Sequence, residues 1–416
     1  MRIVKLTPAV EKKLLRARRE RDAEAERVVS EIVADVRKRG NAALFAWAKR
    51  LDGTDLRREN LWTSEGDIRG ARKQVPPHFL RAVKHAARNV RRLAERQLPK
   101  PWTIEVESGV KITQVVRPIE SIGCYIPGGQ FSLVSTLIMT VVPAIVAGVP
   151  KIEVVCPRPN TALLSAAAIL GIKRIARIGG AQAIAALAYG TESISRVEKI
   201  FGPGNKYVTA AKQLVSSDCA IDLPAGPTEA IVFCEHGNAR WIAADLLAQA
   251  EHAKDAASLF VTTSRSLARE VQREIQRQLA ELPSGIARFS TGQAGAILVA
   301  GSLVQACDFL NRYAPEHLSL PENANGLLQK IRSAGTVFLG PWAAQPLGDY
   351  LSGSNHVLPT GGWARKRGGL SATDFVKCIS VQSITRKGFF RLGHAVETLA
   401  ESEGLIAHRN AVRVRR

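Results

Sequence analysis

The sequence lacks the features that define several classes of protein. Its 416 residues include only six cysteines, and no two of them have the CxxC spacing. This pattern argues against a disulfide framework and against a thiolate zinc knot, so we expect reduced thiols. No apolar run approaches the roughly 18 residues that a membrane-spanning helix requires, and no apolar signal core precedes the first charges. We therefore expect a cytoplasmic protein with no membrane partner.

Acidic residues are few relative to basic ones. The chain has 58 Lys and Arg but 37 Asp and Glu, which gives a formal net charge of +21. Such an excess fits either nucleic-acid binding or a solvated basic surface. The basic residues concentrate in the first hundred positions, without interleaved aromatic residues or zinc-finger spacing. We favour the basic surface and expect no specific nucleic-acid partner.

Hydrophobic periodicity divides the chain into two kinds of region. Residues 8–50 and 66–98 carry apolar residues at helical spacing, which predicts helices. Trp102 to Val116 alternates and predicts a hairpin. From residue 119 to about residue 340, short apolar strands alternate with helical runs through compact turns. This βαβ alternation is typical of parallel doubly wound sheets, so we predict an α/β protein with two Rossmann-like units.

The dinucleotide fingerprint GxGxxG is absent, because Gly202-Pro203-Gly204 does not continue with a third glycine. A nicotinamide cofactor therefore cannot be argued from that loop. Tyr125, Gln182 and Asn205 nevertheless each follow a predicted strand, at the sheet edge where ligands of such folds gather. The glycine-rich turns beside them could equally be architectural.

Two pairs of residues stand out for their chemistry. Gln249 and His252 lie three positions apart on a predicted helix, so both are expected on one face. They could form half of a metal site or be solvated surface residues. Glu316 and His317 offer two adjacent bases of different strength. An apolar setting would raise the carboxyl pKa and keep the imidazole neutral; the alternative is a helix-end pair exposed to water.

Further oxygen and nitrogen donors occur in the last third of the chain. Asp349, His356 and His408 lie in Gly-rich or terminal segments, where polar residues are often only solvated. Combined with Gln249 and His252, the residues Asp349 and His408 give a donor set without thiolate. Such a set suits Zn²⁺ in an open catalytic site better than in a closed structural one.

Six segments together resemble the histidinol dehydrogenase family. They read FGPGNKYVTAAK, IDLPAGPTE, DLLAQAEH, YAPEHL, GDYLSGSNHVLPT and EGLIAHRNAV, and their order and spacing match from about Ala25 to the C-terminus. The resemblance implies a zinc-dependent homodimer that oxidises L-histidinol to L-histidine with two NAD⁺. The reaction would form the last steps of histidine biosynthesis and pass through an aldehyde held on the enzyme.

The resemblance also implies roles for individual residues. The implied zinc ligands are Gln249, His252, Asp349 and His408, and the implied cofactor contacts are Tyr125, Gln182 and Asn205. Glu316 and His317 match the catalytic pair: His317 would take the alcohol proton, and Glu316 would activate water for addition to the aldehyde. Substrate contacts are implied for Thr228, His356 and Glu403, together with the zinc ligands and the catalytic pair.

The same resemblance implies how the chain is divided into domains. Residues 1–24 are expected to form a helical segment, and residues 25–119 with 228–362 a first α/β domain that carries the metal and the catalytic pair. Residues 120–227 would form a second, NAD-binding α/β domain. Residues 363–416 would form a tail that reaches the partner's site, so that Glu403 and His408 act in trans. The Gly- and Arg-rich run 361–369 is expected to lead into this tail as an exposed loop.

Three departures from the family pattern bear on the substrate. Thr228 replaces the usual serine, the segment Gln130 to Ser135 lacks the common small-residue and Pro-Ser pattern, and the loop Trp363 to Gly369 is unusually basic. Because of these changes, a second hypothesis is a dehydrogenase on the same scaffold that acts on another primary alcohol or a diol. A basic binding protein that has lost catalysis is the third hypothesis.

Overall fold

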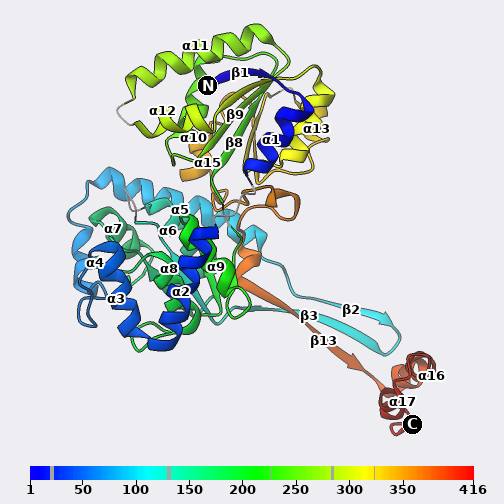
Figure 1. Cartoon of the computed structure of the whole chain (residues 1–416). Helices are drawn as coiled ribbons and strands as arrows, with labels where there is room; N and C mark the ends of the chain where they lie inside the picture. Colours follow the sequence, from blue (N-terminus) through cyan, green and yellow to red (C-terminus); the bar gives the residue numbers. More distant parts are fainter. Residues whose placement is uncertain (19–22, 129–132, 225, 283–284, 323) are drawn as a thin grey trace.

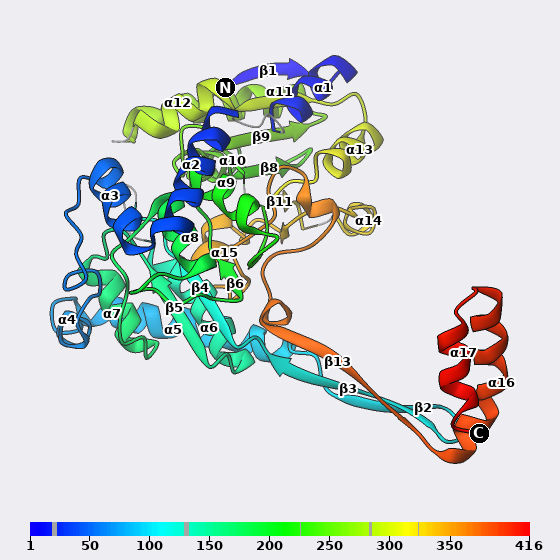
Figure 2. The same cartoon turned by 60° about the horizontal axis from the view of Figure 1, so that its bottom comes forward.

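The computed structural model describes residues 1–18, 23–128, 133–224, 226–282, 285–322 and 324–416. Two α/β bodies lie next to each other, and a three-stranded ribbon projects away from them and ends in two helices (Figures 1 and 2). We call these parts the six-stranded body, the four-stranded body, the ribbon and the tail. The predicted α/β class with two parallel sheets is confirmed.

The six-stranded body is built on a parallel sheet with the strand order β1-β10-β9-β8-β11-β12. Its strands are β1 (Arg2–Lys5), β8 (Glu229–Phe233), β9 (Ala257–Thr262), β10 (Ala296–Val299), β11 (His317–Leu320) and β12 (Thr336–Leu339). Its helices are α1 (Pro8–Ala17), α10 (Ala239–Ala250), α11 (Arg265–Glu281), α12 (Gly285–Gln293), α13 (Leu303–Tyr313), α14 (Asn325–Leu328) and α15 (Gln345–Tyr350). Because α10 and α11 cover one face and α1 and α13 the other, the central strands are apolar on both sides.

The four-stranded body has a second parallel sheet, with the order β5-β4-β6-β7. Its strands are β4 (Ser121–Tyr125), β5 (Lys151–Val155), β6 (Lys199–Phe201) and β7 (Ala220–Ile221). Its helices are α2 (Ala23–Arg39), α3 (Asn41–Asp52), α4 (Glu65–Ala71), α5 (Pro77–Gln97), α6 (Val134–Ala147), α7 (Thr161–Ile169), α8 (Gly180–Tyr189) and α9 (Lys206–Val215). Helices α2, α3, α8 and α9 share a core on one side of the sheet, and α5, α6 and α7 share a core on the other.

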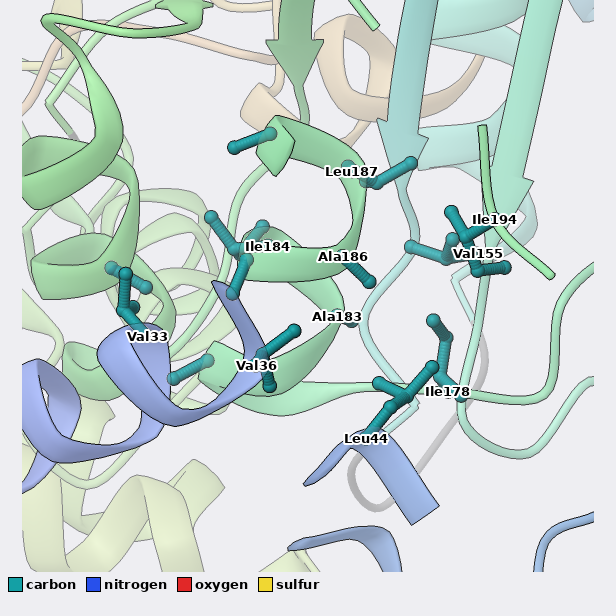
Figure 3. Packing of buried hydrophobic residues seen from close by; sticks show 14 of the residues in the cluster. Val33, Val36, Leu44, Val155, Ile178, Ala183, Ile184, Ala186, Leu187 and Ile194 are labelled. Carbon is teal, nitrogen blue, oxygen red and sulfur yellow. The ribbon is translucent and has the colours of Figure 1, made fainter. Parts of the chain in front are cut away.

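Helix α8 is the centre of one of these cores. Its sequence GAQAIAALAY is apolar all round, and eight of its ten residues are buried. Figure 3 shows Ile184 facing Val33 and Val36 of α2, while Leu187 and Ala186 point toward the strands. A helix without a polar face is stable only when other elements surround it. The alanine-rich sequence of α8 also keeps the helix narrow enough for α2 to pack closely against it.

The ribbon joins two distant parts of the chain. Strand β13 (Val376–Ile384) pairs antiparallel with β3 (Val110–Pro118), which pairs with β2 (Trp102–Glu107) in the predicted hairpin. The tail follows β13 and consists of α16 (Arg386–Ser402) and α17 (Ile406–Arg413). In both views the tail lies far from the two bodies (Figures 1 and 2).

The grouping of the N-terminal elements differs from our expectation. Residues 1–24, expected to be a helical segment, begin with β1, which pairs with β10 at the edge of the six-stranded sheet. Helices α2 to α5, expected to pack with residues 228–362, pack against the four-stranded sheet instead. An amphipathic stripe specifies that a helix buries one face, but it does not specify which sheet that face covers.

The run 361–369 also differs from the expected exposed loop. Ala364 is buried, and the Arg367 guanidinium lies 2.7 and 2.9 Å from the two carboxylate oxygens of Asp374. Arg365 donates a 2.6 Å hydrogen bond to the carbonyl of Arg312. The arginines that suggested a solvated loop therefore fasten this segment to the bodies. In the segment from Gln130 to Ser135, residues 130–132 lie outside the described part of the chain.

Among the described residues, no helix is both long and apolar enough to cross a membrane.

Candidate active site

Glu316 and His317 lie where helix α13 passes into strand β11. Ala314 ends α13 in the left-handed conformation, with φ at 51°, and Pro315 then directs the chain into the sheet. Such a backbone is costly for a residue with a Cβ, and surrounding structure must hold it in place. Glu316 and His317 are only 6% and 4% exposed, so the alternative of a water-exposed helix-end pair is wrong.

The neighbouring strand β8 holds both side chains. Glu316 Oε2 accepts hydrogen bonds from the Thr228 hydroxyl at 2.6 Å and from the Glu229 backbone amide at 2.8 Å. His317 Nδ1 lies 3.3 Å from the Glu229 carbonyl. A carbonyl can only accept, so this contact assigns the ring proton to Nδ1 and leaves Nε2 as the acceptor. Nε2 is buried and faces the Asp349 carboxylate, whose Oδ1 lies 3.5 Å away.

The electrostatics of the Glu316–His317 pair agree only partly with expectation. Burial raises the pKa of Glu316 to about 7, although His317 and the Thr228 hydroxyl oppose the rise. For His317, burial alone would lower the pKa, but the carboxylates of Glu316 and Asp349 outweigh it and raise the pKa. The expectation of a raised carboxyl pKa is therefore confirmed. The imidazole, however, is surrounded by negative charge and not by an apolar pocket.

Asp349 reaches the pair from helix α15. A Cβ at Gly348 would lie 2.6 Å from the Phe338 ring, so only glycine allows α15 to approach β12 this closely. Asp349 Oδ1 then lies 3.5 Å from His317 Nε2, and Oδ2 lies 3.9 Å from His252 Nε2. Burial would raise the pKa of Asp349, but the surrounding histidines together lower it. Asp349 is therefore a carboxylate between two imidazoles.

His252 lies beside Asp349, and Gln249 contacts the same helix α15 through Gln345. The spacing predicted one helix face for Gln249 and His252, but His252 falls two residues beyond the end of α10. Gln249 is fully buried, and its amide donates to the Thr228 hydroxyl at 2.9 Å and accepts from Gln345 at 2.5 Å. Partial burial lowers the pKa of His252, whose side chain is still 44% exposed, and this favours the neutral imidazole that binds metals. Five of the predicted residues thus meet Thr228 at one place.

His356 connects this place with the four-stranded body. Its Nδ1 lies 2.8 Å from the Asp349 carbonyl, and its Nε2 lies 3.4 Å from the Thr136 hydroxyl of α6. Burial lowers the pKa of His356, against the opposing effect of Asp349. The site therefore lies where the two bodies meet.

The predicted cofactor residues lie at the carboxyl ends of strands in the four-stranded sheet. Tyr125 ends β4, and its hydroxyl accepts a 3.2 Å hydrogen bond from the Gly180 amide at the start of α8. Gln182 donates at 3.1 Å to Asp52, while its buried Oε1 has no hydrogen-bond partner among the described residues. Asn205 follows the adjacent strand β6 and caps α9 through its Oδ1, at 3.1 Å from two backbone amides. Tyr125 therefore lies next to the start of α8, the helix that carries Gln182. Strand β6, which leads to Asn205, pairs with the strand that ends at Tyr125.

Glu403 and His408 are not near the other predicted residues of the same chain. Glu403 ends α16 and His408 lies in α17, and both side chains are exposed on the tail (Figures 1 and 2).

Comparison with known proteins agrees with this arrangement. The sequence profile of the histidinol dehydrogenase family matches residues 15–416. Histidinol dehydrogenase from Aquifex aeolicus is 43% identical over 398 residues, which cover 95% of this chain and 93% of the relative. The protein of the same name from Geobacter sulfurreducens is 45% identical over 400 residues, covering 94% and 93%. The chain belongs to the histidinol dehydrogenase family.

A solved structure supports the same placement within the histidinol dehydrogenase family. The crystal structure of histidinol dehydrogenase from Elizabethkingia anophelis has a TM-score of 0.93 and 37% identity, and the match covers 100% of this chain and 98% of that one. The protein is therefore an oxidoreductase with the fold of its family.

The resemblance to histidinol dehydrogenases implies a zinc ion, so the spacing of the possible donor atoms matters. Among the described residues, no group of three or more His, Cys, Asp and Glu side chains could hold a metal. His252 Nε2 and Asp349 Oδ2 lie 3.9 Å apart, which is wider than the roughly 3.3 Å between two ligands of a tetrahedral zinc ion. The amide of Gln249 is adjacent. Gln249, His252 and Asp349 thus supply the donor types of a zinc site but do not complete it. A further donor would have to come from elsewhere.

Sequence reasoning missed three contributors to the site. Glu229 contacts the Glu316–His317 pair. Gln345 contacts Gln249, and Asp52 contacts Gln182. The residue types alone offered no signal for them, because each acts through a contact with a residue distant in sequence. The site also lies at the amino-terminal edge of the six-stranded sheet, where β8 and β11 begin. Only the predicted cofactor residues lie at carboxyl ends of strands, where the general rule expects ligands, and they do so in the four-stranded sheet.

Proposed function

We propose that this protein oxidises L-histidinol to L-histidine, using one zinc ion per subunit and two NAD⁺ per substrate. The buried Glu316–His317 pair beside Asp349 and His252 carries the proposal. It combines a proton acceptor, a carboxyl group with a pKa of about 7 and two metal donors. This combination suits an alcohol oxidation that is followed by addition of water.

In the first oxidation, His317 accepts the hydroxyl proton of the substrate while hydride passes from carbon to NAD⁺. The Glu229 carbonyl supports this role, because it holds a ring proton on Nδ1, so that the neutral ring accepts a proton at Nε2, beside the Asp349 carboxylate. The raised pKa makes the neutral imidazole a stronger proton acceptor. The product is an amino aldehyde, NADH and one proton.

In the second oxidation, Glu316 takes a proton from water as the water adds to the aldehyde. The resulting singly ionised gem-diol gives a second hydride to NAD⁺ and becomes a carboxylic acid, which releases its remaining proton to give the carboxylate of L-histidine. The pKa of Glu316, about 7, allows the group to take up and release protons near neutral pH. Thr228 and Glu229 both bond to Oε2, so Oε1 is the oxygen available to water.

Zinc would be held by Gln249, His252 and Asp349 of one chain and by His408 of another. When bound, the ion would hold the amine and imidazole of the substrate and so fix the reacting carbon. Thr228, His356 and Glu403 would contact the substrate, with the Glu403 carboxylate balancing its positive charge. Because the protein as a whole is strongly basic, this local carboxylate matters more than the net charge.

NAD⁺ would bind at the four-stranded body through Tyr125, Gln182 and Asn205. The buried Gln182 Oε1, which has no hydrogen-bond partner among the described residues, supports this assignment, because a buried acceptor without a partner is costly unless a ligand satisfies it. The absence of a GxGxxG loop requires contacts of a different kind from those of the usual dinucleotide fold.

The tail would complete the site of a second copy in a homodimer. Its position far from its own bodies supports exchange, as do exposed apolar residues such as Leu399 and Ile406, which are 63% and 48% exposed. The described part of a single chain leaves both side chains uncovered. In a symmetric pair, each tail would bring Glu403 and His408 to the partner.

A dehydrogenase for another primary alcohol or a diol is the second candidate. Thr228 favours it, because the threonine methyl occupies space beside Gln249 and Glu316 that a serine would leave free. Membership in an oxidoreductase family sets aside the third hypothesis, a basic binding protein without catalysis. The cytoplasmic location stays a prediction, which cell fractionation would check.

The deciding experiment measures NADH formed from L-histidinol and NAD⁺, with and without a chelator. We expect two NADH per histidinol, loss of activity with the chelator and recovery with Zn²⁺. A folded, zinc-loaded dimer that forms no NADH would contradict the proposal and favour the second candidate. Other primary alcohols and diols would then be screened.

Tail exchange is tested by mixing two inactive variants. One chain carries His317→Ala and has an intact tail, while the other carries His408→Ala and has an intact body. Random reassortment of dimers should restore about a quarter of the parent activity, because half the dimers are hybrids with one complete site of two. If the tail acted on its own body, the mixture would stay inactive.

A further inference from the structure

Glu229 is the first residue of β8, and both of its backbone groups contact the Glu316–His317 pair. Its amide donates to Glu316 at 2.8 Å, and its carbonyl lies 3.3 Å from His317 Nδ1. A single residue therefore sets the position of the carboxylate and the tautomer of the imidazole. Any movement of this residue would displace both groups together.

The side chain of Glu229 is buried and anchored from three directions. One carboxylate oxygen accepts a hydrogen bond from the Gly361 amide, the Tyr313 hydroxyl contacts the carboxylate, and the Arg18 guanidinium forms a close ion pair with it. The Glu229 side chain is only 3% exposed. A carboxylate at this depth requires such compensation.

Arg18 is itself held firmly. Its guanidinium carbon lies 3.6 Å above the centre of the Tyr313 ring, and one nitrogen donates to the Tyr313 carbonyl. The side chain is 9% exposed and extends from the end of α1. A planar, permanently charged group that is stacked and hydrogen-bonded has little freedom to move. Arg18 thus fixes the carboxylate of Glu229 to the six-stranded body.

We propose that Glu229 is a positioning residue for the Glu316–His317 pair and that Arg18 anchors it. The inference rests on the proposed function for its kinetic consequence, but its structural consequence can be observed independently. Glu229 contacts neither of the reacting atoms, since its side chain points to Arg18 and not to Asp349. Its main contribution is the placement of its own peptide groups, beside the smaller effect of its charge, which raises the pKa of Glu316. Small displacements of catalytic groups reduce turnover strongly.

The test compares Arg18→Met, Glu229→Gln and the double variant with the parent, all as full-length dimers. Each single change leaves one buried charge unpaired, so we expect kcat to fall about 10- to 100-fold while KM stays within about threefold. The double variant removes both charges, and the amide oxygen of the introduced glutamine can still accept from Gly361. We therefore expect it to fold and to recover part of kcat.

Arg312→Met is the matched control. Arg312 forms an ion pair with Glu11 of α1, at 3.0 Å, and so fastens the same helix without touching Glu229. If Arg18 acted only by holding α1 in place, the control would lose kcat as well. We expect its kcat to equal that of the parent.

Crystal structures of the variants provide the readout that does not depend on activity. We expect the His317 ring to shift or rotate when Arg18 or Glu229 is changed, and to stay in place in Arg312→Met. An unmoved ring in both single variants would overturn the inference, whatever the kinetics. So would a displaced ring with unchanged kcat in an active parent. A parent that does not oxidise L-histidinol would contradict the proposed function alone, and the ring positions would still decide this inference.

Discussion

Glu316 and His317 of the six-stranded body are 6% and 4% exposed, whereas Glu403 and His408 lie exposed on the tail. The body pair is held by two hydrogen bonds to Glu316 and by a backbone carbonyl beside His317. In the tail, all of which is described, α17 buries no residue, and α16 buries only two glycines and one alanine.

This difference separates two ways of building a site. The body positions its polar groups with its own chain, before any ligand binds. The tail carries its polar groups on helices that pack mainly on each other, so only a second surface can give them a defined position. Under the proposed function, that surface belongs to the partner, and catalysis and assembly depend on each other.

The largest effect is expected from His317→Ala, which removes the proton acceptor on the body side of the comparison. We expect kcat for NADH formation to fall about 10²- to 10⁴-fold, with zinc content unchanged by elemental analysis. His85→Ala serves as the control, since His85 is exposed on α5 and should leave turnover at the parent level. Unchanged turnover in His317→Ala would remove this residue from the role of the base.

The next effect concerns the tail. His408→Ala should lower zinc affinity at least about 100-fold, because losing even a group that supports a metal ligand costs about 10- to 100-fold. Competition with a zinc-binding dye measures it, and excess Zn²⁺ should restore part of the activity. His394→Ala changes an exposed histidine of α16 and should bind zinc like the parent. Equal affinities in both variants would show that the tail supplies no ligand.

A smaller effect is expected from Asp245→Asn, because Asp245 is an exception within the well-paired body. No hydrogen bond or ion pair joins this half-buried carboxylate to a described residue, and burial raises its pKa to about 6 from an ordinary value of 3.8. Folding thus favours the protonated form of Asp245. The stabilisation of the fold by this protonated carboxyl is fully present below pH 3.8 and is lost as the pH rises through about 6. At pH 8, Asn should stabilise the fold by at most about 3 kcal/mol.

Urea unfolding at several pH values checks this prediction. The advantage of Asp245→Asn over the parent should close below about pH 4, where the parent carboxyl is also neutral. Asp255→Asn, at an exposed position just after α10, is the control and should unfold like the parent. Destabilisation by Asp245→Asn at pH 8 would instead indicate that a basic group of a second copy pairs with Asp245.

The smallest effect is expected from Thr228→Ser. The hydroxyl that donates to Glu316 and accepts from Gln249 is kept, so kcat with L-histidinol should change less than about threefold. Thr228→Val keeps the shape but leaves both partners without their bond, and kcat should fall about 10-fold or more. Similar rates in the serine and valine variants would show that the hydroxyl is unimportant. A large gain for Thr228→Ser would favour a native substrate other than L-histidinol.

Much of the fold could be predicted from local patterns. The alternation of apolar strands and helices after residue 119 specified parallel sheets, since each crossover needs a helix. The alternating run from Trp102 correctly predicted a hairpin. The pairing of β13 with β3 could not be predicted, because it joins segments more than 250 residues apart. Most side chains are exposed on β13 and half-buried on β3, so neither strand showed a clear alternation of buried and exposed positions.

The sequence motifs predicted which residues would come together better than they predicted how these residues are arranged. Motifs named Gln249, His252, Glu316, His317 and Asp349, and the fold places them together. They did not place the site at the amino-terminal edge of the sheet, nor did they name Glu229, which acts through its backbone. Backbone groups are the same in every residue, so no motif marks the one that a fold uses.

The sequence by itself determined the α/β class, which depends on local periodicity, and the residue types that the fold brings together, which depend on side-chain chemistry. Only the tertiary structure decided which sheet α2 to α5 cover, which carbonyl fixes the His317 tautomer and which charges surround it. These features depend on distances between segments far apart in the chain. Such distances are set by the packing of whole helices and strands, so no short stretch of sequence contains them.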